Sequence, residues 1–198
     1  MYIIGLTGGI ACGKSSVAET LRRYFQAVTI DIDNVTHWLS EPGGVLFEIY
    51  VRHFGDYIIA EDGKLNKKLI GEIIFTQPDE RAWINSVAHP ILLNYIRDFF
   101  VDCSEIGAGL VVAEVPLLFE AGWEHLFDEI WAVYTPRVLQ MERLMSRDKL
   151  TEQQALARIK AQMPVREICA RADVKIRNVG GYKKVRKQVR SALGGRIF

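Results

Sequence analysis

The chain has 198 residues, of which 49% are hydrophobic and 25% are charged, and its formal net charge is +1. This length suits one domain with a sizeable core. The near-neutral charge argues against a protein that binds nucleic acid through bulk electrostatics, and no apolar run reaches the length of a membrane span. Three widely spaced cysteines form neither a metal-ligand pattern nor a disulfide framework. We therefore expect a reduced, cytoplasmic protein. A monomer or a weak homo-oligomer is a separate expectation, which the composition does not decide.

The first elements of the chain surround a glycine-rich motif. Residues 2–6 read as a short buried strand, and residues 15–25 have the spacing of a helix with one apolar face. Between them stands Gly8-Gly9-Ile10-Ala11-Cys12-Gly13-Lys14-Ser15, a complete G-x-x-x-x-G-K-[ST] phosphate-binding loop. In this motif backbone N–H groups and the helix N-terminus hold phosphate oxygens, the lysine reaches the outer phosphates, and the hydroxyl ligates Mg²⁺. The sequence therefore predicts a nucleoside triphosphate site.

Further strands are expected over residues 28–31, 110–115, 128–134 and 174–176, with helical patterns between them. Strands that alternate with helices indicate an α/β fold, here a five-stranded parallel sheet sandwiched by helices. The sheet core is expected over residues 1–38, 104–135 and 173–198 of a single domain. A helical insertion over about 39–103 would hold the acceptor, and a helical lid over about 136–172 would close over the donor.

Two helix starts can be placed from local signals in the lid region. Thr135 is expected to be an N-cap residue, with Pro136 in the first helical position after it. Residues 151–154, Thr-Glu-Gln-Gln, form a capping box that should start the next helix.

Carboxylates are expected at the end of the sheet that carries the loop. Asp31 and Asp33 follow the second strand, and Glu114 ends the third. A carboxylate there can accept a proton from an attacking hydroxyl, or hold Mg²⁺ directly or through water. Asp33 can equally cap the helix that follows it, and Glu114 can be an ordinary acid at a strand end. We favour the functional reading, more strongly for Asp33 than for Asp31.

Other candidate residues have plausible structural explanations. Arg143 and Arg147 are four residues apart and share a helix face, which suits contact with phosphates but also a solvated, salt-bridged surface. His37 could face the acceptor, whereas His89, before Pro90, marks a bend in the insertion. Leu117, in an apolar loop after the third strand, could contact a ligand or pack in the core.

The most distinctive segments of the chain are the phosphate loop, residues 31–37 (Asp-Ile-Asp-Asn-Val-Thr-His), residues 115–120 (Val-Pro-Leu-Leu-Phe-Glu), residues 143–148 (Arg-Leu-Met-Ser-Arg-Asp), Gln162-Met163-Pro164 and Asn178. Together they resemble the dephospho-CoA kinase family, and the resemblance covers essentially the whole chain. The loop alone is common to many families, but in combination with residues 115–120 and the lid arginines it is specific.

The resemblance implies transfer of the γ-phosphate of ATP to the 3′-hydroxyl of the ribose of dephospho-CoA, with Mg²⁺. It implies a P-loop kinase core with a helical CoA-binding insertion and a lid. Asp33 matches the proposed base, while Lys14, Arg143 and Arg147 match the groups that act on the phosphates. The ATP-binding residues would be Gly9, Ala11, Cys12, Gly13, Lys14, Ser15, Ser16 and Asn178. The acceptor-binding residues would be His37, Lys67, His89, Leu117 and Phe119, and the metal ligand would be Ser15, helped through water by Asp33 or Glu114.

The chain departs from the family pattern at a few positions. Ala11-Cys12 stands where Gly-Ser is usual, Lys67 where an arginine is common, Ile168 where a lysine is common, and Arg177 where an aspartate is common. Two other functions stay open at this point. One is a kinase of another small acceptor, a nucleoside or nucleotide. The other is a nucleotide-hydrolysing switch, against which the absence of an Asn-Lys-x-Asp guanine-reading segment argues.

Overall fold

The computed structural model describes residues 1–196, except for the side chain of Phe75. The chain divides into two compact units, unit 1 comprising Met1–Asp31 with Asp102–Phe198, and unit 2 comprising Ile32–Val101. Unit 2 begins seven residues before the expected start of the insertion, because the helix that follows the second strand belongs to it. The last two residues of the core segment expected over 173–198 lie outside the described part.

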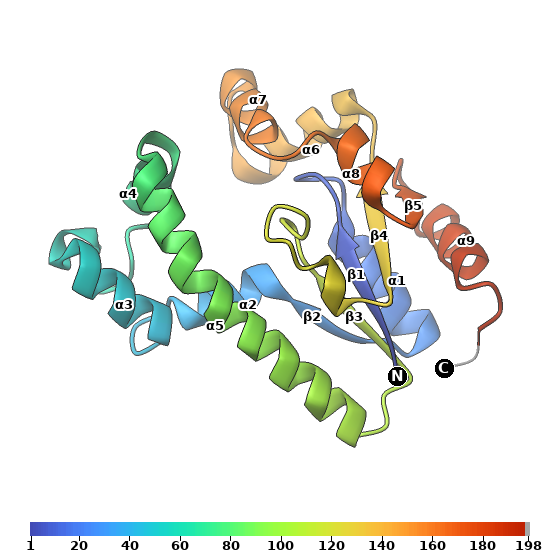
Figure 1. Ribbon diagram of the computed structural model, residues 1–198. Helices are drawn as coiled ribbons and strands as arrows, with labels where there is room; N and C mark the ends of the chain where they lie inside the picture. Colours follow the sequence, from blue (N-terminus) through green and yellow to red (C-terminus); the bar gives the residue numbers. More distant parts are fainter. Residues whose placement is uncertain (197–198) are drawn as a thin grey trace. The chain divides into compact units, whose positions relative to one another are not determined.

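Unit 1 is built on a parallel sheet, which in the described residues has five strands in the order β2-β3-β1-β4-β5 (Figure 1). The strands are β1 (Tyr2–Thr7), β2 (Val28–Asp31), β3 (Leu110–Glu114), β4 (Glu129–Tyr134) and β5 (Val174–Arg177). This confirms the predicted α/β class and all five expected strands. The chain visits one side of β1 first and the other side later, so β1 lies at the point where the strand order reverses. Ligands of open α/β sheets bind at the carboxyl ends of the strands at such a point.

The helices of unit 1 are α1 (Lys14–Phe25), α6 (Arg137–Asp148), α7 (Glu152–Lys160), α8 (Val165–Arg171) and α9 (Tyr182–Leu193), with a 3₁₀ turn η2 (Glu124–Leu126). Helices α1 and α9 pack against each other and cover one face of the sheet (Figure 1). Val17 and Leu21 of α1 meet Val185, Val189 and Leu193 of α9 in one buried cluster, as the apolar spacing of both helices predicts.

The burial of β3 on both faces explains why its sequence is an unbroken apolar run. Every residue of β3 is buried, because β3 lies between β2 and β1 and both of its faces are covered. A strand in this position reads as an unbroken apolar run rather than an alternating one. On the face opposite α1 and α9, the loop between β3 and β4 comes so close that a Cβ on Gly5 would meet Phe127 and Leu118 at 2.7–2.8 Å.

Unit 2 is helical. Its elements are α2 (Ile32–Leu39), α3 (Val45–Phe54), η1 (Asp56–Ile58), α4 (Lys67–Thr76) and α5 (Pro78–Glu105), the last of which continues into unit 1. A single antiparallel bridge joins Ile59 to Leu65 among the described residues. The expected bend at His89 does not end a helix, since α5 remains helical through Pro90. The N–H that proline lacks would have bonded to the carbonyl of Ser86, and both residues are exposed, so water can satisfy that carbonyl.

Helix starts in unit 1 agree only partly with the local signals. The capping box is confirmed: the Thr151 hydroxyl accepts from the Gln154 N–H at 3.3 Å, and the Gln154 side chain accepts from the Thr151 N–H at 2.9 Å. The N-cap expected at Thr135 is wrong. Helix α6 begins one residue later than expected, with Pro136 before it, and the Thr135 hydroxyl donates instead to the carbonyl of Asn178 at 2.9 Å.

Gly8, the first residue after β1, packs closely against the sheet, and a substitution there measures how close this packing is. Gly8 has φ +139°, and a Cβ there would lie 2.1 Å from the carbonyl oxygen of Val133 in β4. Gly107 also has a positive φ, +70°, but open space around it. We expect Gly107→Ala to cost about 1–2 kcal/mol through backbone strain, and Gly8→Ala to cost about 1–3 kcal/mol more because of the clash. Urea unfolding followed by circular dichroism measures both, and equal losses would contradict the close approach.

Candidate active site

The phosphate loop joins the central strand to a helix, as the sequence predicts. β1 ends at Thr7 and α1 begins at Lys14. Gly8, Ala11 and Gly13 have φ values of +139°, +58° and +87°, so three of the intervening residues have positive φ. The Lys14 ammonium donates to the carbonyl of Gly8 at 3.0 Å, which folds the side chain back over the loop. In the first turn of α1 the Ser16 N–H donates to the Gly13 carbonyl at 3.2 Å, and the N–H groups of a first helical turn suit an anion.

The peptide groups of Ile10 are held by two glutamine side chains. The Gln140 amide in α6 donates to the Ile10 carbonyl at 2.9 Å, and the Ile10 N–H donates to Gln162 Oε1 at 2.8 Å. Gln162 lies between α7 and α8, so the lid region contacts the loop directly. Sequence reasoning gave neither glutamine a role. The only signal was that Gln162 lies in a motif shared with the family.

Asn178 connects three parts of the site. Its side-chain amide donates to the carbonyls of Cys12 at 3.1 Å and Gly13 at 3.4 Å. Its own backbone carbonyl accepts from the Thr135 hydroxyl and, at 3.2 Å, from the Arg143 guanidinium. A Cβ on Gly13 would lie 2.1 Å from the Asn178 amide nitrogen, so the contact requires a glycine. The structure thus places Asn178 and Arg143 beside the loop, where the Asn178 amide supports two of its carbonyls.

A hollow of about 330 Å³ opens beside the loop. It is lined by Gly13, Ser16, Arg143, Asn178, Gly180, Gly181, Tyr182 and Val185. A second hollow of about 410 Å³ lies next to Gly9 and Gln140, between the loop and the helices of the lid region. The Cys12 thiol is fully buried, and burial raises its pKa, so Cys12 contributes its backbone rather than a reactive sulfur.

The lid arginines have different surroundings. Arg143 is half-buried and reaches Asn178, whereas Arg147 is exposed and its Nε lies 2.7 Å from the carboxylate of Asp148. Arg158 of α7 shares the same carboxylate at 2.7 Å. The hydrogen bond from Arg147, followed by the charges of both arginines, lowers the pKa of Asp148. The salt-bridged alternative therefore describes Arg147 in this structure, with Asp148 as its partner.

Two carboxylates stand side by side at the carboxyl edge of the sheet. Asp31 and Glu114 are register partners of β2 and β3, and Glu114 also pairs with Leu6 of β1. Glu114 is buried. The Ser15 hydroxyl is exposed in the first turn of α1. Residues 1–196 contain no cluster of three or more His, Cys, Asp or Glu side chains that could hold a metal by themselves. The Ser15 hydroxyl and the two carboxylates are few ligands for a metal ion. They fit Mg²⁺ that is bound mainly through substrate phosphates and water.

The apolar loop after β3 presents only one of its large side chains. Leu117 is 46% exposed, while Leu118 and Phe119 are buried. The Arg171 guanidinium covers the Phe119 ring at 4.3 Å from its centroid, and Glu120 Oε1 accepts from the N–H of Met163 at 3.1 Å. Leu117 is therefore available to a ligand. Phe119 has little surface to offer and supports the loop instead.

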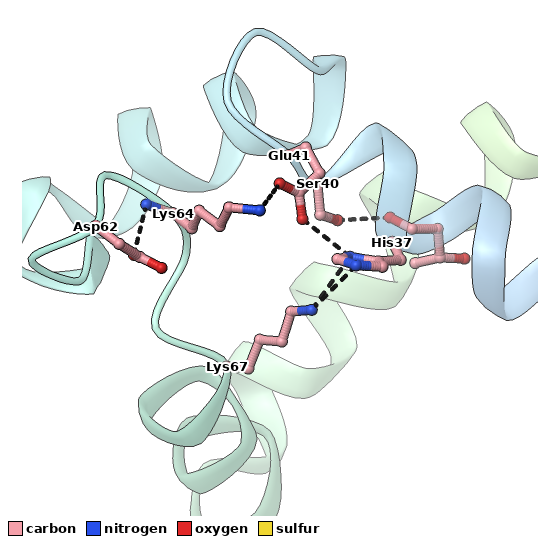
Figure 2. Close-up of polar contacts among 7 residues, drawn as sticks. His37, Ser40, Glu41, Asp62, Lys64 and Lys67 are labelled. Atoms are coloured by element: carbon pink, nitrogen blue, oxygen red, sulfur yellow. Dashed lines mark hydrogen bonds and ion pairs between the residues drawn. The ribbon is translucent and has the colours of Figure 1, made fainter.

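The remaining predicted residues lie in unit 2. Asp33 is in the first turn of α2 and His37 lies one turn later, both exposed. Figure 2 shows the Lys67 ammonium beside the His37 ring, 3.2 Å from Nδ1 and 3.3 Å from Nε2. His89 lies in α5, where burial lowers its pKa. The structure thus brings His37 and Lys67 together.

The loop at the central strand, the braced Asn178 and the arginine helix define a P-loop kinase. Comparison with known proteins narrows the class: residues 2–184 match the family model described as dephospho-CoA kinase, so the chain belongs to that family. The dephospho-CoA kinase of Carboxydothermus hydrogenoformans is 40% identical over 191 residues, covering 96% of this chain and 92% of the relative. The predicted family is therefore confirmed.

Solved structures agree with this assignment. A crystal structure of a Thermus thermophilus protein has a TM-score of 0.83 and 30% identity, covering 98% of this chain and 96% of the other. The dephospho-CoA kinase from Campylobacter jejuni has a TM-score of 0.67 and 27% identity, with coverage of 97% and 95%. In the described part of this chain, no helix is both long enough and apolar enough to cross a membrane.

The left-handed alanine in the loop leads to a stability prediction. Ala11 has φ +58°, a conformation that costs an L-residue roughly 1–2 kcal/mol and a glycine almost nothing. We expect Ala11→Gly to raise the free energy of unfolding by about 1 kcal/mol, corresponding to a melting temperature about 2–4 °C higher.

Ala161 provides the matched control, because it is exposed and right-handed, with φ −74°. Ala161→Gly should lower stability by about 0.5–1 kcal/mol. If thermal unfolding shows both variants to be destabilised, strain at Ala11 does not account for the difference.

Proposed function

We propose that this protein transfers the γ-phosphate of ATP to the 3′-hydroxyl of the ribose of dephospho-CoA and so produces coenzyme A. The observation that carries the proposal is the match to the dephospho-CoA kinase family over residues 2–184, which include the phosphate loop and all of unit 2. A cytoplasmic location, consistent with three free thiols, and a monomeric or weakly self-associating state are part of the proposal.

The donor is held at the loop. Backbone N–H groups at Ala11, Gly13 and Ser15 and the Lys14 ammonium bind the phosphates, for which Lys14 exchanges its contact with the Gly8 carbonyl. The N–H of Ile10 keeps its bond to Gln162. The hollow lined by Gly13, Arg143 and Tyr182 adjoins the loop and takes the nucleoside. Ser15 would hold Mg²⁺, with water-mediated support from Glu114 or Asp33. When bound, the ion would neutralise charge on the phosphates.

Asp33 accepts the proton of the attacking hydroxyl. It is an exposed carboxylate in the first turn of α2, a rigid position two residues after β2 ends. A carboxylate on a helix rather than on a mobile loop can orient the hydroxyl as well as take its proton. Because phosphoryl transfer needs little covalent help from the protein, most of the acceleration comes from positioning and charge.

The two lid arginines act at different stages. Arg143 already lies beside Asn178, so it can contact the phosphates without leaving its present position. Arg147 must first exchange the Asp148 carboxylate for a phosphate oxygen, and Arg158 can keep Asp148 neutralised when this happens. The acceptor is contacted by unit 2 residues His37, Lys67 and His89 and by Leu117.

A panel of acceptors tests the proposal directly. With ATP and Mg²⁺, we expect phosphorylation of dephospho-CoA and only background rates with nucleosides, nucleoside monophosphates or water. The product is identified by chromatography and mass. Phosphorylation of a nucleoside monophosphate in place of dephospho-CoA would contradict the choice of acceptor. ATP hydrolysis that is independent of any acceptor would indicate a switch.

Substitution at the proposed base and at the loop lysine tests their roles. Asp33→Asn keeps the shape but removes the proton acceptor, and Lys14→Ala removes the cation that binds the outer phosphates. We expect each to lower kcat by about 10²–10⁴-fold, with thermal unfolding temperatures near that of the parent. Asp98→Asn, an exposed change on α5, serves as the control and should leave turnover unchanged. A near-normal rate for Asp33→Asn would rule out its role as base.

A further inference from the structure

A group of basic side chains gathers on unit 2 around a single carboxylate. His37 of α2, Lys64 of the loop between η1 and α4, and Lys67 of α4 form this basic cluster, and Glu41 lies among them (Figure 2). The Lys64 ammonium binds Glu41 Oε2 at 2.5 Å, and Glu41 Oε1 lies 3.3 Å from Nδ1 of His37. Three sequence segments therefore converge on one small surface.

The charges of the basic cluster are not balanced. Hydrogen bonding to Lys64 is the main cause that holds the pKa of Glu41 below its usual range, so this carboxylate is ionised and already engaged. The Lys67 ammonium contacts the His37 imidazole, and within residues 1–196 no carboxylate lies within ion-pair distance of it. Asp62 accepts from the backbone N–H of Lys64 rather than from its ammonium. Glu41 thus pairs with the ammonium of Lys64 but not with that of Lys67.

The basic cluster is accessible to a ligand. The side chains of His37 and Lys64 are 48% and 52% exposed, and Lys67 is exposed as well. An imidazole orients an ammonium group without cancelling its charge, whereas a carboxylate would cancel it. This arrangement favours an anion with several acceptor oxygens, since Lys offers a compact charge with three donors.

The position of His37 on α2 restricts which anion the basic cluster can bind. His37 lies four residues, about 6 Å along the helix axis, beyond Asp33. In dephospho-CoA the diphosphate is attached to the 5′ carbon of the same ribose whose 3′-hydroxyl reacts. Only the width of the sugar therefore separates the reacting hydroxyl from the first phosphorus, and a group one turn from Asp33 is suitably placed for it.

On the basis of the proposed function, we propose that the basic cluster binds the diphosphate of dephospho-CoA, with Lys67 as its principal contact. Glu41 is the internal counter-charge that this diphosphate partly displaces. The cluster thereby gives the acceptor site a preference for nucleosides that carry a diphosphate over nucleosides that do not.

Neutralising Lys67 tests the proposal against a closely matched control. Lys67→Met removes the charge and keeps the length of the side chain. Lys68→Met makes the same change one residue further along the exposed first turn of α4. We expect Lys67→Met to raise KM for dephospho-CoA about tenfold, a loss of about 1.4 kcal/mol. Its KM for ATP and its kcat should stay within about twofold of the parent, and Lys68→Met should change none of the three constants.

Two further measurements separate ligand binding from a structural role. KM for dephospho-CoA should rise less steeply with salt in Lys67→Met than in the parent, because one screened interaction is gone. Glu41→Gln should lower KM for dephospho-CoA or leave it unchanged, since it removes the competing carboxylate. The proposal is overturned if Lys67→Met behaves like Lys68→Met, or if Glu41→Gln raises KM as Lys67→Met does. Failure of the parent protein to phosphorylate dephospho-CoA would instead overturn the proposed function.

Discussion

The hydrogen bonds from the Asn178 amide to the carbonyls of Cys12 and Gly13 fix the far end of the phosphate loop. A loop that must direct its N–H groups at an anion leaves its carbonyls facing elsewhere, and buried carbonyls need donors. Asn178 supplies them from the end of β5, while Gln140 and Gln162 satisfy both sides of the Ile10 peptide. The loop conformation is therefore specified by side chains far away in the sequence, and the motif alone does not determine it.

The same contact couples the loop to the arginine helix. Arg143 bonds to the backbone carbonyl of Asn178, so the arginine and the loop share one support. Arg147, one turn later on α6, instead contacts Asp148, which Arg158 also neutralises. Two arginines that look equivalent in the sequence therefore differ in the contact that each would give up in the proposed binding of phosphate. The partly exposed pairs with Asp148 are worth little individually, so exchanging that carboxylate for a phosphate is a small cost for Arg147.

What could be predicted from the sequence depended on how local the determining interaction is. The loop, the five strands and the capping box at Thr151 follow from neighbouring residues, and the structure confirms them. The hydroxyl of Thr135 has a partner 43 residues away, so a local capping rule assigned it wrongly. The roles of Gln140 and Gln162 depend on partners more than 100 residues distant, and no periodicity could reveal them. The ion pair of Arg147 with its neighbour Asp148 shows that spacing identifies a shared helix face but does not decide between a phosphate and a carboxylate as the partner.

In the proposed reaction, the negative charges of donor and acceptor are opposed by different kinds of group in the two units. In unit 1 the charge opposing the phosphates comes mostly from backbone N–H groups and a helix terminus, which are fixed in place and change little with salt or pH. In unit 2 the proposed diphosphate contact comes from side chains around Glu41, with Lys67 where the family resemblance leads us to expect an arginine. A lysine lacks the planar fork that grips two phosphate oxygens at once. The contact of Lys67 with an imidazole partly offsets this loss, because His37 limits the freedom of the ammonium group while leaving its charge available. With a lysine in place of an arginine, the proposed acceptor site lacks a bidentate contact and relies on an ammonium charge near His37 and Glu41. Binding of the acceptor should therefore respond more to nearby substitutions than binding of the donor.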